Sequence, residues 1–265
     1  MLARMVMIRL GASPAVVTVV AEAGGRVGSL TVDGVELLVA GGPAEHPMVW
    51  GSFPMAPWAG RVRNARFEFD GAVYDLPPSL PPHAGHGTVY TQPWVRTDDG
   101  ADPGVADLAC ELGPSWPLGG RAEQRISVTP SALICQLAVI AGDQAMPAEL
   151  GWHPWFRTSG PIDLRTRQMY ERVGELPTGR LVPPAPPPWD DCFVTTEPVH
   201  FPVGPLDVAV SSDTDHVVVF DGSSSGIAVE PQTGPPDAFH LAPRRLAPGE
   251  RLEATMTISW KRRTR

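Results

Sequence analysis

Hydrophobic and polar residues alternate with a period of two along much of the chain. The clearest run is Arg251–Trp260, in which every second residue from Leu252 to Trp260 is apolar and the residues between them are mostly Glu, Thr and Ser. Such alternation predicts a β-strand with one buried and one solvated face. Shorter β-type runs occur at Ala15–Ala21, Ser29–Val32, Arg66–Phe69, Arg125–Thr129, Leu133–Ala141, His216–Phe220 and Gly226–Val229.

Turn residues separate these runs. The chain has 31 prolines and 27 glycines, and their spread leaves no long window with a clear helical stripe,. Asp33-Gly34 and Asp70-Gly71 each stand between β-prone residues, which predicts two hairpins,. The pattern therefore predicts an all-β fold, a large antiparallel β-sandwich, with residues 1–265 as a single domain. We expect the proline-rich stretch Val182–Pro188 to be a surface crossover loop rather than a linker.

Charge and cysteine content narrow the classes of function. A net charge of −8 argues against nucleic-acid binding, and we expect the basic stretch Lys261–Arg265 to be a solvated terminus,. The first 20 residues lack the apolar stretch of a signal peptide or a membrane span,. Three widely spaced cysteines show no zinc or disulfide pattern and suit a reducing compartment, so we expect a cytoplasmic protein without a membrane partner,. The oligomeric state is left open.

Two segments combine an ionisable side chain with rigid or aromatic neighbours. His153 lies between Trp152 and Trp155 and precedes a proline, which favours an extended backbone,. An imidazole titrates near neutral pH, and the tryptophans offer a platform for a sugar ring. Glu230 follows an apolar run and precedes Pro231, which predicts a position at a strand end where burial would raise its pKa,. A structural histidine and a surface glutamate are the alternatives.

Three further residues are candidates for binding. Arg61 offers a fork of donors that suits sugar hydroxyls, although a surface arginine is equally consistent with its sequence context,. His86 lies in a glycine-flanked loop three residues after His83, but this spacing lacks a third metal ligand, so we expect no metal,. Asp190 and Asp191 follow a tryptophan and could accept hydroxyl hydrogen bonds or form a turn,. The chain has no nucleophile elbow, phosphate loop or dinucleotide-binding motif, so we expect no cofactor,.

Taken in order, these segments resemble the aldose 1-epimerase (galactose mutarotase) family. The resemblance covers nearly the whole chain and is carried by Gly24–Leu30, Gly60–Phe67, Ala84–Gly87, Met146–Phe156, Trp189–Phe193 and Val229–Phe239. It implies a large β-sandwich with an open cleft. It also implies that Glu230 is the general base, that His153 is the general acid, and that Arg61, His86 and Asp190 contact the sugar. Gly60 departs from the family, in which an asparagine often precedes the arginine.

The function that the resemblance implies is interconversion of the α and β anomers of a free aldose, a monosaccharide, by acid–base opening and closure of the ring. We expect the two catalytic groups to lie on opposite sides of C1. Three other functions are weighed: a carbohydrate-binding protein without catalysis, a glycoside hydrolase with two carboxylates, and an epimerase of hexose 6-phosphates. The last would need clustered arginines, for which Arg63, Arg157 and Arg244 are candidates,. The sequence does not identify the sugar.

Overall fold

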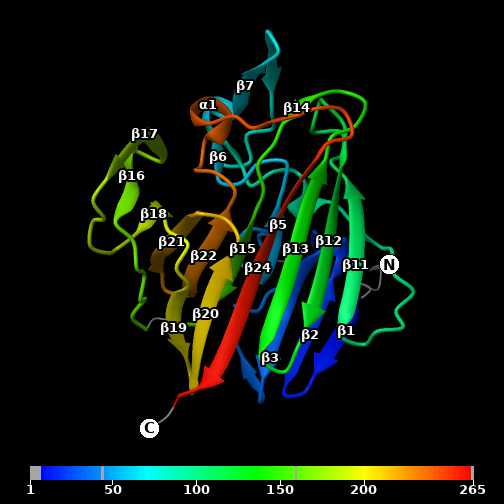
Figure 1. Ribbon diagram of the computed structural model, residues 1–265, viewed down its shortest axis with the longest axis vertical. Helices are drawn as coiled ribbons and strands as arrows, with labels where there is room; N and C mark the ends of the chain where they lie inside the picture. The colour runs from blue at the N-terminus through cyan, green and yellow to red at the C-terminus, as the bar shows by residue number, and fades with distance from the viewer. Residues whose placement is uncertain (1–6, 43–44, 159, 264–265) are drawn as a thin grey trace.

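The computed structural model describes residues 7–42, 45–158 and 160–263 and shows two stacked β-sheets (Figure 1). The larger sheet has 11 strands, and its pairings are antiparallel. In spatial order its strands are β1 (Met7–Ala12), β2 (Ala15–Val20), β3 (Arg26–Val32), β5 (Ser52–Met55), β15 (Gly151–Phe156), β22 (Gly226–Gln232), β21 (His216–Ser223), β18 (Asp190–Val194), β16 (Gln168–Val173) and β17 (Leu176–Val182), with β4 (Val35–Glu36) beside β3.

The second sheet has seven strands and lies in front of the first in Figure 1. Its order is β10 (Val95–Arg96), β11 (Val105–Glu111), β12 (Arg121–Val128), β13 (Ala132–Ile140), β24 (Arg251–Arg262), β20 (Leu206–Ser212) and β19 (Val199–Val203). Burial alternates strictly along β12 and along most of β24, which is the predicted period-two pattern,. The buried faces of both sheets join in one apolar cluster, to which β22 contributes Val229 and β24 contributes Met256,.

Short elements surround one end of the sandwich (Figure 1). Three two-stranded pairs are formed by β6 (Arg61–Val62) with β9 (Ala84–Gly85), β7 (Arg66–Phe69) with β8 (Ala72–Asp75), and β14 (Met146–Pro147) with β23 (Arg245–Leu246). The helices are α1 (Ala238–Leu241) and three 3₁₀ turns, Ala21–Ala23, Arg63–Ala65 and Val89–Thr91. Within the described ranges, no helix has the length and apolar character needed to cross a bilayer.

The predicted all-β fold and the antiparallel β-sandwich are confirmed. Both hairpins form: Val32 pairs with Val35 around Asp33-Gly34, and Phe69 pairs with Ala72 around Asp70-Gly71,. Val182 ends β17, and the rest of the proline-rich stretch is an exposed loop that joins β17 to β18 within one sheet, as expected of a crossover. The prediction that Glu230 ends its strand is wrong. Strand β22 continues through Pro231 to Gln232, because the neighbouring strands still pair there: Val217 on β21 pairs with Pro231, and Gly151 on β15 pairs with Gln232.

Candidate active site

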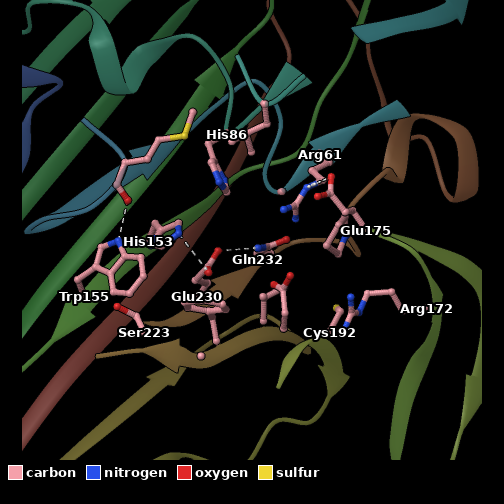
Figure 2. Close-up of a pocket in the computed structure, with 18 of the residues that line it drawn as sticks. Arg61, His86, His153, Trp155, Arg172, Glu175, Cys192, Ser223, Glu230 and Gln232 are labelled. Carbon is pink, nitrogen blue, oxygen red and sulfur yellow. Dashed lines mark hydrogen bonds and ion pairs between the residues drawn. The ribbon is translucent and has the colours of Figure 1, made fainter. Parts of the chain in front are cut away.

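The sheet register brings His153 and Glu230 together. On the neighbouring strands β15 and β22, Gly151 pairs with Gln232 and Trp155 pairs with Ala228, so the same antiparallel register sets His153 opposite Glu230. Their side chains share the sheet face that points away from the second sheet, because side chains alternate between faces along a strand. His153 Nε2 lies 3.3 Å from Glu230 Oε1 (Figure 2). Two segments 77 positions apart in the sequence thus form one pair.

Both members of the pair are buried, and burial decides their protonation. The exposed fraction is 6% for His153 and 3% for Glu230. Burial raises the pKa of Glu230 well above its usual value, the Asp190 carboxylate raises it further, and Arg61 opposes the shift,. Burial likewise lowers the pKa of His153 well below its usual value, with His86 contributing. Each shift disfavours the charged form of its own group, so burial favours a protonated Glu230 beside a neutral His153, and the pair then holds one proton,.

The pair faces a cavity of about 600 Å³, a volume typical of small-molecule sites,. The cavity lies over β15, β22, β21 and β18 and is bordered by the β16–β17 hairpin and the loops around β6 and β9 (Figure 2). Its lining includes all five residues named from the sequence: Arg61, His86, His153, Asp190 and Glu230. It also includes Trp155, Tyr170, Arg172, Glu175, Cys192, Phe220 and Gln232.

Aromatic rings fix the plane of the His153 imidazole. Phe53 stacks on the imidazole at a centroid distance of 4.7 Å, and Trp155 stacks on it at 5.3 Å. His86 meets it edge-on at 5.0 Å. Of the two tryptophans that flank His153 in the sequence, only Trp155 lines the cavity, whereas Trp152 packs in the core between the sheets. Trp155 is therefore the tryptophan available to a sugar ring.

His86 is held by a tight backbone arrangement. The residue has φ +61°, its N–H donates to the carbonyl of Gly60 at 2.8 Å, and its Nδ1 lies 2.9 Å from Met55 Sδ. The next residue, Gly87, has φ +76°, and a Cβ there would lie 2.0 Å from the Ala56 carbonyl oxygen, so only glycine fits,. Burial and then Arg61 lower the pKa of His86 to about 3. His86 is thus a neutral imidazole that can hydrogen-bond to a hydroxyl.

Arg61 reaches the cavity from β6, which pairs with the strand just before His86. Gly60 precedes it with φ +59°, a conformation that asparagine also tolerates,. A Cβ at position 60, however, would lie 2.7 Å from the Cβ of Pro236. The close approach of Pro236 therefore explains why this chain has glycine at position 60, where the family that it resembles often has asparagine.

The two neighbouring aspartates have different surroundings. Asp190 lines the cavity, whereas Asp191 does not and accepts a hydrogen bond from Arg172 Nε at 2.9 Å. Of the two, Asp190 is therefore the one that faces the cavity.

Other residues weighed for a metal or a phosphate have different partners. His83 accepts a hydrogen bond at Nδ1 from the N–H of Asn64. Across the described ranges, no group of three or more His, Cys, Asp and Glu side chains is arranged to hold a metal ion. Arg63 forms an ion pair with buried Asp237, and neither Arg157 nor Arg244 lines the cavity.

Sequence reasoning missed Gln232 and the residues of the β16–β17 hairpin. Gln232 is fully buried, and its Nε2 donates to Glu230 Oε2 at 3.4 Å. Its Oε1 has no hydrogen-bond partner within the described structure. Its place two residues after Glu230, on the same strand face, was a signal that could have identified it. Tyr170, Arg172 and Glu175 carry no local motif, and only the fold brings them to the cavity.

Comparison with known proteins agrees with this architecture. The sequence model described as aldose 1-epimerase matches residues 7–239, which is most of the chain. The chain belongs to the aldose 1-epimerase family. Among curated proteins, the chain is similar to the uncharacterized protein YphB of Escherichia coli K12. The two are 27% identical over 158 residues, which is 58% of this chain. That match spans only 52% of YphB, about half the length of that relative.

Solved structures show the same fold. A galactose mutarotase-like protein from Clostridium acetobutylicum superposes with a TM-score of 0.87 at 14% identity, over 98% of this chain and 96% of that one. The galactose 1-epimerase from Lactobacillus acidophilus NCFM gives a TM-score of 0.78 at 15% identity, over 95% and 92% of the two chains. At identities this low, the superpositions show that this chain has the galactose mutarotase-like sandwich, but they do not identify its substrate.

Proposed function

We propose that this protein is an aldose 1-epimerase that interconverts the α and β anomers of a free aldose. The observation that carries the proposal is the His153–Glu230 pair, 3.3 Å apart and buried at the floor of the cavity. A protein that only binds sugar needs hydrogen bonds and an aromatic platform. It does not need a carboxyl and an imidazole whose pKa values burial moves in opposite directions,.

The chemistry requires two coupled proton transfers. A cyclic aldose is a hemiacetal, so its ring opens when the C1 hydroxyl loses a proton and the ring oxygen gains one. In our proposal the reacting pair carries its one proton on His153, so that Glu230 takes the first proton as a carboxylate and His153 supplies the second as an imidazolium. Ring opening thus leaves the proton on Glu230, which is the form that burial favours. The resulting aldehyde rotates about C1–C2, and the ring closes on the other face with the two roles reversed. No net proton is gained or lost, which matches a pair that holds one proton.

The position of the pair changes one expectation. The two groups lie side by side on one sheet face, 3.3 Å apart, so we propose that both approach the sugar from the same wall of the cavity. This arrangement still suits the reaction, because the C1 hydroxyl and the ring oxygen are bonded to the same carbon. Two adjacent groups on one wall can therefore each reach one of these oxygens. Arg61, His86 and Asp190 then orient the remaining oxygens, with Trp155 beside the ring,.

Polarimetry on a freshly dissolved anomer tests the function directly. We expect catalytic amounts of the protein to accelerate the approach of α-D-glucose or α-D-galactose to its equilibrium rotation. Binding of the sugar without acceleration would support the carbohydrate-binding alternative. Release of a chromogenic aglycone from a glycoside, with no effect on free aldoses, would support the hydrolase. Either result contradicts the proposal.

The pH profile of the reaction follows from the buried pair. Activity needs one proton on the pair, and burial penalises both the doubly protonated cation and the fully deprotonated anion. Relative to an exposed pair, the lowered pKa of His153 moves the acid limb down and the raised pKa of Glu230 moves the alkaline limb up. We expect kcat/KM to stay level past pH ~6.5, the ordinary pKa of histidine, before it falls. A maximum confined below that pH would contradict this.

A further inference from the structure

A carboxylate reaches the cavity rim from the tip of the β16–β17 hairpin. Val173 pairs with Leu176, so Gly174 and Glu175 form the turn, and Gly174 takes φ +62°. This turn directs Glu175 towards β6, and Glu175 lines the same cavity as the His153–Glu230 pair (Figure 2). The resemblance to the aldose 1-epimerase family implies no role for Glu175.

Glu175 faces two groups on the opposite rim. Its Oε2 lies 3.6 Å from Arg61 Nε and 3.9 Å from His83 Nε2. Because His83 accepts a hydrogen bond at Nδ1, a neutral His83 carries its hydrogen on Nε2, towards Glu175,. Arg61 Nε is buried and has no hydrogen-bond partner in the described part of the chain, and it forms an ion pair with Glu175. Glu175 therefore neutralises the guanidinium proposed to bind the sugar.

The second arginine of the cavity is neutralised as well. Arg172 donates from Nε to Asp191 at 2.9 Å and from a terminal nitrogen to the carbonyl oxygen of Gly174 at 2.8 Å. With both guanidinium groups matched by carboxylates, Asp190 and the His153–Glu230 pair are left to set the balance of charge. That balance is negative, because Asp190 adds a carboxylate to the two matched arginines and the pair is neutral when it holds one proton.

We infer that this site selects uncharged aldoses over anionic ones, and that Glu175 is a specificity-determining residue that enforces the selection. The inference rests on the proposed epimerase function and names its substrate class. A uronic acid or a sugar phosphate needs an arginine free to pair with its anionic group, in the bidentate geometry that carboxylates and phosphates favour. Here Glu175 and Asp191 already pair with both candidates, so neither guanidinium is free to pair with the anionic group of a sugar.

The test compares two sugars that differ only at C6. We expect wild-type kcat/KM for D-galactose at pH 8 to exceed that for D-galacturonate. In the Glu175→Gln variant, which keeps the size of the side chain and removes its charge, we expect the galacturonate-to-galactose ratio of kcat/KM to rise about tenfold. High salt should narrow the wild-type preference, because ions screen charges near the surface. A change of packing alone would not respond to salt.

Glu171→Gln is the matched control. Glu171 lies on the same hairpin, pairs with Arg180 and does not line the cavity, so its variant should leave the ratio unchanged. Equal wild-type efficiency on both sugars, or an unchanged ratio in Glu175→Gln, overturns the inference. If the wild type accelerates no aldose, the proposed function fails separately. Calorimetric binding of the same two sugars to wild type and Glu175→Gln then decides whether Glu175 discriminates by charge.

Discussion

Replacement of Glu230 by glutamine is expected to lower kcat for mutarotation by at least about 100-fold, the usual contribution of one positioned acid or base. The amide keeps the shape of the side chain and the contact with Gln232, but it cannot take the proton of the C1 hydroxyl. Because Glu230 acts in the transition state, kcat should fall more than the affinity for the sugar. Polarimetry over a range of sugar concentrations separates the two effects.

His153→Asn is expected to show a loss of similar size, because the ring oxygen would then lack its proton donor. The double variant should have a kcat only slightly lower than that of the less active single variant, since the two residues form one proton-transfer unit. Matched controls are Glu253→Gln and His200→Asn, whose positions on β24 and β19 are exposed and outside the cavity. Near-normal turnover in either active-site variant refutes the role assigned to that residue.

The fold could be predicted because its signals are local. Alternation along strands such as β24 and the Asp-Gly turns at Asp33 and Asp70 depend only on neighbouring residues, and the structure follows them. The interior of the large sheet was harder to predict. Strands β15 and β22 are buried on both faces and include Pro154 and Pro231, so neither alternation nor the usual exclusion of proline marked their ends,.

The site divides in the same way. His153 and Glu230 could be named because each stands in a short motif of aromatic and proline residues, but their contact depends on a register between strands that are distant in sequence. Glu175 could not be named, because an acidic residue after a glycine is an ordinary turn. Its role depends on the distance from the hairpin tip to Arg61, which only the folded chain determines.

Replacement of Arg26 by methionine should give the largest loss of stability. Arg26 is fully buried in β3, and its guanidinium donates to the backbone carbonyls of Ala23, Pro47, Trp50 and Tyr90 at 2.6–3.2 Å. It also lies 4.2 Å from the Trp50 ring centroid. Burial lowers its pKa to about 10, so it remains charged at neutral pH. Methionine would fill similar space but leave these carbonyls without a donor.

We expect Arg26→Met to lower the free energy of unfolding by about 3–5 kcal/mol, because unpaired buried polar groups are costly and their effects do not add fully. Chemical denaturation measures the change, and Arg9→Met, at an exposed position of β1, should stay within about 0.5 kcal/mol,. By donating to the carbonyls of Pro47 and Trp50, Arg26 ties the 47–50 segment at the cavity rim to strand β3 of the large sheet. Its guanidinium also lies over the ring of Phe53, which stacks on His153. A loss below about 1 kcal/mol would mean that water or neighbouring donors replace the guanidinium.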